Sequence, residues 1–216
     1  MGGLTLRRFA AFGSLLLFLV SMSGAHAGQI AVGEAQVAFA PPPGYCELSR
    51  SEGRDALFVD GVTQAMGPEV RILSAFASCE QLQPWRKGLL TYLRDYGFLT
   101  VARADERRTI TDGRPTIVRA LAKAMRATNA ETTGDEPGID HLGVLHEDDR
   151  GVYYGLVMDV ETPEGNPRGA LEVSGMTLIR GKLLSYVLYG EFAGRPSIDA
   201  MLGRQRADLD RLIAAN

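Results

Sequence analysis

The sequence predicts an α+β domain, with an antiparallel β-sheet meander, helices packed mainly on one face and an amphipathic C-terminal helix. The sheet is indicated by residues 141–189, where short apolar runs alternate with turn residues. The turns are Asp-Asp-Arg-Gly at 148–151, Thr-Pro-Glu-Gly-Asn-Pro at 162–167 and Arg-Gly at 180–181. The C-terminal helix is indicated by apolar side chains at helical spacing after residue 197.

The first elements of the chain are a strand and a helix. Residues 30–39 alternate loosely between apolar and polar side chains and predict one strand, which the prolines at 41–43 end. Residues 54–66 carry apolar side chains near helical spacing, and predict a helix that Gly67 and Pro68 stop.

The next segment holds a strand and a stretch of ambiguous periodicity. Residues 70–76 alternate and predict a second strand. Trp85 follows Pro84, so we expect a turn at that point. Residues 89–101 fit a strand and a helix equally well, and their aromatic side chains indicate burial in either case.

A second helix is expected from residues 112–115 onwards, because proline is tolerated in the first turn of a helix. Its apolar positions are Ile117, Val118, Leu121 and Met125. Residues 129–138 predict a polar loop. The four strands that we expect to pair as a meander are 141–145, 152–160, 169–179 and 182–189.

The last helix has the clearest pattern. Ser197 is expected to cap its first turn. Its apolar stripe consists of Ile198, Met201, Leu202, Leu209, Leu212 and Ile213. Charged side chains lie away from that stripe, so we expect the helix to lie across the sheet.

The N-terminus has the three zones of a secretory signal peptide. Arg7 and Arg8 precede an apolar run at 9–20, and the small residues that follow end in Ala25-His26-Ala27. The run is too short to span a membrane, for which roughly 20 apolar residues are needed. We therefore expect residues 1–27 to be a signal peptide cleaved after Ala27, and 28–216 to form a single domain in the periplasm. The arginine pair leaves the twin-arginine export route open.

Charge limits the classes of partner. The chain has a net charge of −3, and the signal peptide holds two of its 23 basic residues and none of its 26 acidic ones, so the exported part carries about −5. A mildly acidic domain is a poor candidate for binding nucleic acid in general.

Two cysteines, Cys46 and Cys79, occur in the exported part. An even number of cysteines in an oxidising compartment predicts a disulfide between them. The alternative is a metal or redox pair, but the C-x-x-C spacing that such pairs often have is absent.

The two histidines of the exported part, His141 and His146, are five residues apart on a predicted strand, so their side chains should point to opposite faces. Acidic residues at 147–149 could supply metal ligands beside His146, although a charged turn explains the same pattern. No serine-hydrolase, nucleotide-binding or zinc-protease motif occurs in the exported part. The sequence therefore predicts no catalytic, cofactor-binding or metal-binding residues.

A basic block at 103–126 precedes an acidic block at 131–149. Within the basic block, Arg119, Lys123 and Arg126 share one face of the predicted helix, opposite its apolar side chains. This patch could bind an anionic surface such as a phospholipid. The alternative is a solvated helix face that pairs with the acidic block.

Four segments carry a resemblance. They are 43–46, the pair Cys79 and Trp85, 143–155 and 178–184. Together they resemble an uncharacterised family of exported alphaproteobacterial proteins, from which no activity is implied. The order of extended start, proline break, meander and terminal helix is more faintly similar to Mog1/PsbP-like domains, which implies a binding or assembly module.

These features favour a non-catalytic periplasmic module that binds a protein or another envelope component. One alternative is a periplasmic hydrolase or metal-dependent enzyme whose site is assembled from distant residues. Another is peripheral binding to an anionic membrane surface through residues 103–126.

Overall fold

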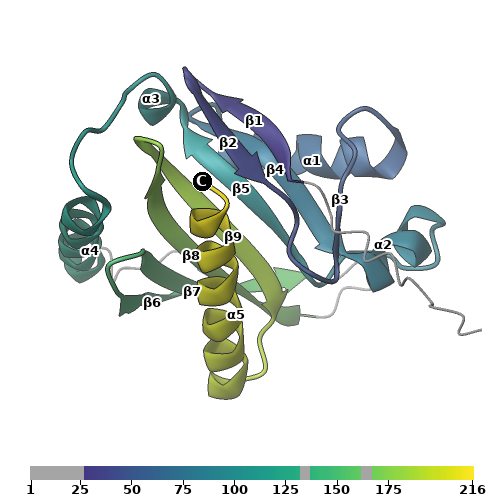
Figure 1. The fold of residues 1–216 in the computed structure, drawn as a ribbon. Coiled ribbons are helices and arrows are strands. Elements are labelled where there is room, and N and C mark those ends of the chain that lie inside the picture. The colour runs from purple at the N-terminus through teal and green to yellow at the C-terminus, as the bar shows by residue number, and fades with distance from the viewer. Residues whose placement is uncertain (1–26, 132–136, 162–166) are drawn as a thin grey trace, which may run out of the picture.

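A computed structural model describes residues 27–131, 137–161 and 167–216. Seven antiparallel strands form one sheet in the order β3-β4-β5-β9-β8-β7-β6, and β1 and β2 form a separate hairpin (Figure 1). With the helix at the C-terminus, this arrangement confirms the predicted α+β class.

The structure contains nine described strands and five described helices. The strands are β1 (Gly28–Val32), β2 (Ala35–Phe39), β3 (Tyr45–Glu47), β4 (Val70–Ser78), β5 (Tyr96–Ala102), β6 (Ile139–Glu147), β7 (Val152–Glu161), β8 (Pro167–Ile179) and β9 (Lys182–Glu191). The helices are α1 (Gly53–Met66), α2 (Cys79–Arg86), α3 (Arg103–Glu106), α4 (Arg114–Glu131) and α5 (Arg195–Ala214). Strands β6 to β9 form the expected meander, and β9 then pairs with β5.

Both faces of the sheet are covered. Helix α5 and the β1-β2 hairpin pack on one face, over a core that includes Phe76, Leu99 and Tyr186 (Figure 1). Helices α1 and α2 pack on the other face around Phe98, and α4 packs near Val152 on that same face. Most helices thus share one face, as expected, while α5 lies opposite them.

The predicted strand at 30–39 is a hairpin instead. The chain turns at Gly33, which has a φ of 57°, in the left-handed region that glycine adopts without strain. A Cβ atom at Gly33 would lie 2.2 Å from the carbonyl oxygen of Glu106, so the position also lacks space for a side chain. The loose alternation reflected two strands that pair with each other.

The expected turn at Trp85 is also wrong, because Trp85 lies in helix α2. Burial of Leu82 and Trp85 on that helix outweighs the backbone hydrogen bond that Pro84 removes. The ambiguous segment 89–101 consists of a loop followed by the first residues of β5. The short elements β3 and α3 have no periodicity long enough to predict them.

Two helix ends differ from the expectation. Helix α4 extends to Glu131, past the start of the expected loop at 129. Helix α5 begins at Arg195, so Ser197 lies in its first turn and is not the N-terminal cap. The Ser197 hydroxyl donates to the Gly194 carbonyl and accepts from the Ala193 amide, which still ties the helix start to the preceding chain.

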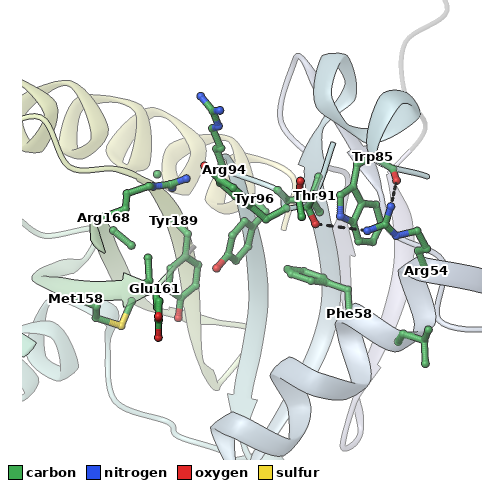
Figure 2. Close-up of a pocket in the computed structure, with 16 residues that line it drawn as sticks. Arg54, Phe58, Trp85, Thr91, Arg94, Tyr96, Met158, Glu161, Arg168 and Tyr189 are labelled. Atoms are coloured by element: carbon green, nitrogen blue, oxygen red, sulfur yellow. Dashed lines mark hydrogen bonds between the residues drawn. The ribbon is translucent and has the colours of Figure 1, made fainter. Parts of the chain in front are cut away.

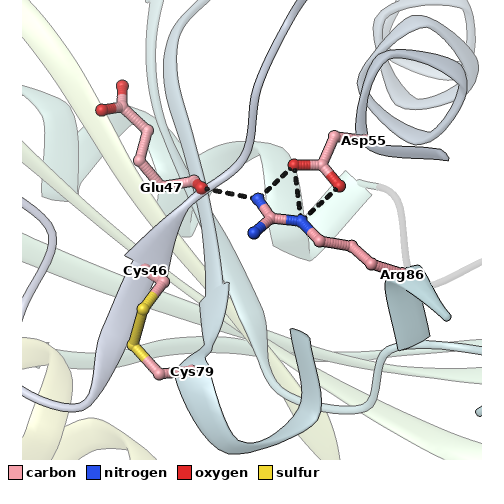
Figure 3. Close-up of a disulfide and its surroundings, with 5 residues drawn as sticks. All are labelled: Cys46, Glu47, Asp55, Cys79 and Arg86. Atoms are coloured by element: carbon pink, nitrogen blue, oxygen red, sulfur yellow. Dashed lines mark hydrogen bonds and ion pairs between the residues drawn. A yellow bond between two sulfur atoms is a disulfide. The ribbon is translucent and has the colours of Figure 1, made fainter. Parts of the chain in front are cut away.

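The predicted disulfide joins Cys46 of β3 to Cys79 of α2, with their Cα atoms 5.0 Å apart (Figure 3). Beside it, Arg86 of α2 donates to the carboxylate of Asp55 in α1 and to the carbonyl of Glu47. The disulfide and the ion pair thus fix α1, α2 and β3 to one another. Among the described helices, none is long and apolar enough to cross a membrane.

Candidate binding pocket

A pocket of about 560 Å³ opens between the α1–α2 pair and the ends of strands β7, β8 and β9 (Figure 2). The loop between α2 and β5 closes a further side. The lining residues are Arg54, Leu57, Phe58, Trp85, Thr91, Tyr92, Leu93, Arg94, Tyr96, Met158, Val160, Glu161, Arg168, Ala170, Tyr189 and Gly190. This volume lies within the range of small-molecule sites, roughly 300–1,000 Å³.

Aromatic rings form the inner wall of the pocket. Tyr96 of β5 stacks on Tyr189 of β9 with ring centroids 4.8 Å apart, and Phe58 of α1 meets Tyr96 edge-on at 5.2 Å. Trp85 of α2 meets Phe58 edge-on at 5.9 Å. The wall therefore joins two strands to two helices through ring contacts, which favour such edge-on and offset arrangements.

The tyrosines of this wall stay uncharged at neutral pH. Burial raises the pKa of Tyr96 to about 12, with a smaller contribution from the nearby carboxylate of Glu172. Burial likewise raises the pKa of Tyr189, and the charge of Glu172 and a hydrogen bond to it raise it further. The tyrosine rings of the inner wall are thus neutral, and the carboxylate of Glu172 lies beside them.

The helical wall is held by the lining residue Arg54 and by groups behind the pocket. The Arg54 guanidinium donates to the Trp85 carbonyl at 2.6 Å and lies over the indole ring, 4.8 Å from its centroid. The Asp55–Arg86 pair and the disulfide anchor the same two helices. Trp85 therefore has a fixed position, and it is the only tryptophan in the chain.

Two further arginines lie at the pocket without carboxylate partners among the described residues. Arg94 and Arg168 lie 5.5 and 5.0 Å from the centroid of the Tyr92 ring. Within the part of the chain that the structure describes, neither forms an ion pair, and the buried Nε of Arg168 has no hydrogen-bond partner. That Nε is covered by protein atoms, so a ligand in the pocket would meet the terminal amino groups of the half-buried Arg168 side chain.

The mouth of the pocket exposes apolar side chains. Leu57 on α1 is 74% exposed and Val160 on β7 is 36% exposed. The third large exposed apolar residue of the described chain, Leu89, belongs to the loop that closes the pocket. Single exposed apolar residues are ordinary, but the presence of both Leu57 and Val160 at the mouth of one cavity favours a binding site.

A second cavity, of about 630 Å³, lies on the opposite face near the prolines at 41–43. Its charged groups already have partners. Asp208 accepts from the Tyr186 hydroxyl at 3.2 Å and pairs with Arg211. Among its lining residues, this cavity therefore lacks the unpaired arginines and the exposed large apolar side chains of the first.

The basic patch predicted from the sequence lies on α4, away from the pocket. Arg126 pairs with Glu147 at 2.9 Å, and Arg119 lies 3.8 Å from Asp149, so both contact the acidic block at the β6–β7 turn. Lys123 is exposed on the same helix. Pairing with acidic residues lowers the positive charge that this patch can offer to an anionic surface.

The two histidines point to opposite faces, as expected. The Nδ1 atom of His141 lies 2.6 Å from the Tyr154 hydroxyl, whereas the ring of His146 lies beside that of Tyr153. Asp148 lies 3.4 Å from His146 but accepts hydrogen bonds from two backbone amides of the β6–β7 turn. That pattern is the structural role of aspartate in a turn.

No group of three histidine, cysteine, aspartate or glutamate side chains among the described residues could hold a metal ion. Neither histidine lines the pocket. The histidines and the pocket are therefore separate features of the molecule.

The pocket was not predictable as a site from the sequence. Its residues come from segments that are far apart, and the only local signals were the aromatic residues around 89–101 and Trp85. No protein-family model matches the chain, and no curated protein is significantly similar to it.

Proposed function

We propose that this chain is an exported, non-catalytic module that binds an envelope component or a protein through the pocket beside α1 and α2. The observation that carries the proposal is the coincidence of an aromatic cavity, exposed apolar side chains at its mouth and two arginines that form no ion pair among the described residues. Pockets of this kind, mostly apolar with a few polar groups, are typical of ligand sites.

The lining favours binding over catalysis. Its titratable side chains are three arginines, one glutamate and three tyrosines. The raised pKa values of Tyr96 and Tyr189 suit neither of them to act as a base near neutral pH. Arginine is always protonated in practice, which leaves Glu161 as the single candidate for proton transfer in this lining.

Export to the periplasm is part of the proposal. The disulfide suits an oxidising compartment. Strand β1 begins at Gly28, the residue after the expected cleavage site, so removal of residues 1–27 would leave every described strand and helix intact. The resemblance to exported alphaproteobacterial proteins, and more faintly to Mog1/PsbP-like binding modules, points in the same direction.

The proposal is tested with the purified protein as bait in an envelope extract. We compare the wild type with Val160→Glu, which places a charge at the apolar mouth, and with Lys123→Glu as a matched control on α4. The bound component should be captured by the wild type and the control but lost with Val160→Glu. Equal capture by all three would refute a role for the pocket.

A further inference from the structure

The pocket has a charge opposite to that of the whole chain. Its lining includes Arg54, Arg94 and Arg168 and one carboxylate, Glu161, and a second carboxylate, Glu172, lies beside Tyr96 and Tyr189, so the cations still outnumber the anions. The whole chain has a net charge of −3. A local excess of positive charge on an acidic protein favours an anionic ligand.

The three arginines differ in what they can offer. Arg54 donates to the carbonyls of Trp85 and Thr91, so it is already engaged in holding the wall. Arg168 and Arg94 both lie over the Tyr92 ring, and neither forms an ion pair among the described residues. A carboxylate or phosphate at this end of the pocket would accept charge-assisted hydrogen bonds from their guanidinium groups.

The two arginines without an ion pair and most of the apolar side chains lie in different parts of the pocket. In Figure 2 the side chains of Arg94 and Arg168 lie above the stacked tyrosine rings and that of Phe58 lies below them, while the carboxylate of Glu161 lies beside Met158. Leu57 and Val160 extend the apolar part to the surface. A ligand that fits both parts carries an anionic group at one end and an apolar chain at the other.

Resting on the proposed function, we infer that the pocket binds an anionic amphiphile: one acyl or alkyl chain that ends in a carboxylate or phosphate. The head group lies between Arg168 and Arg94, and the chain runs over Tyr96 and Tyr189 towards Phe58. An extended peptide fits less well, because the edge strands β3 and β6, which could pair with a peptide backbone, do not line the pocket.

The fluorescence of Trp85 gives a direct assay, because this single tryptophan lies in the pocket wall. The purified full chain is titrated with dodecanoate, dodecyl phosphate, dodecanol and dodecyltrimethylammonium, each below its micelle concentration. We expect the two anions to bind about tenfold or more tightly than the alcohol and the cation to bind least. The carboxylate and phosphate arms distinguish a fatty acid from a phospholipid-derived ligand.

Variants separate the head group from the chain. Arg168→Gln should abolish the preference for anions while leaving dodecanol affinity within about twofold, and Arg168→Lys should keep part of the preference because it keeps the charge. Arg195→Gln, an exposed arginine at the start of α5, is the matched control and should change nothing. Circular dichroism verifies that each variant is folded; if Arg168→Gln does not fold, Arg94→Gln takes its place.

Equal affinity for dodecanoate and dodecanol, or an unchanged preference in Arg168→Gln, would overturn the inference. So would binding only to vesicles and to none of the monomeric amphiphiles. These results differ from a failure of the proposed function, since a protein captured through the pocket in a Val160-dependent way would leave that function standing without the amphiphile.

Discussion

Asp55 is a buried charged residue that helps to hold the α1–α2 wall. It is 3% exposed, and it accepts hydrogen bonds from the Ser49 amide and the Arg86 guanidinium. Burial alone would raise the pKa of Asp55, but the hydrogen bonds from Arg86 and Ser49 outweigh it and hold that pKa below its usual value. Asp55 is therefore ionised more readily in the folded state than in the unfolded chain, and its ionised form stabilises the fold.

We predict that Asp55→Asn lowers the free energy of unfolding by about 2 kcal/mol at neutral pH, because a charge-assisted contact is lost. Because the pKa of Asp55 is lower in the folded state, its ionised carboxylate stabilises the fold above the pKa of aspartate in the unfolded chain, about 3.9. This stabilisation is lost as the pH falls through the pKa that Asp55 has in the folded state. Urea unfolding should thus show the variant and the wild type converging in acid. A difference that stays constant down to about pH 2 would contradict this account.

Lys182 is a second buried charged residue, and it contacts the end of α3 and the segment that follows it. Its Nζ donates to the carbonyls of Glu106 and Arg108 and lies 3.3 Å from the Thr109 hydroxyl. We predict that Lys182→Met lowers the free energy of unfolding by about 2 kcal/mol, because buried acceptors lose their donor. Limited proteolysis should show faster cleavage near residues 106–110; unchanged cleavage and stability would count against this role.

At the scale of elements, the disulfide connects stability to the pocket. It joins β3 to the first residue of α2, the helix that carries Trp85. Cys46→Ser with Cys79→Ser should lower the free energy of unfolding by about 3–4 kcal/mol in the chain-entropy model. The same variant should bind ligands more weakly at the pocket, which the Trp85 fluorescence titration measures. Unchanged affinity after loss of the disulfide would show that α2 needs no anchor.

Helix α4 offers a contrasting prediction. Since Arg119 and Arg126 contact acidic residues of the β6–β7 turn, we expect Arg119→Ala with Lys123→Ala to leave sedimentation with anionic vesicles unchanged. Exposed pairs of this kind contribute little, so thermal stability should also change little. A clear loss of vesicle binding would restore the membrane hypothesis for residues 103–126.

The sequence predicted the helices and strands better than it predicted which of them pack together. Periodicity was enough for α1, α4, α5 and the β6–β9 meander, because each is long enough to show its apolar face. Gly33 and Trp85 were misjudged, since a two-residue turn and a short proline-containing helix leave no clear period. Local patterns record which side of an element is buried, and they do not record what covers it.

At the scale of the whole molecule, the candidate site depends on sheet order. Tyr96 and Tyr189 stack because β5 pairs with β9, although α3, α4 and three strands separate them in the chain. The disulfide could be predicted because the sequence has only two cysteines. In contrast, β8, which carries Arg168, and α2, which carries Trp85, come to line one pocket only after long-range strand pairing. We therefore place the proposed ligand site where α1 and α2 meet the ends of β7, β8 and β9.

Hydrogen exchange followed by mass spectrometry, with and without envelope extract, tests that location most directly. The account predicts slower exchange in peptides that cover residues 89–96 and 168–172, with Val160→Glu removing the effect. Slower exchange confined to α4 or to the proline segment at 41–43, with the pocket peptides unchanged, would contradict it.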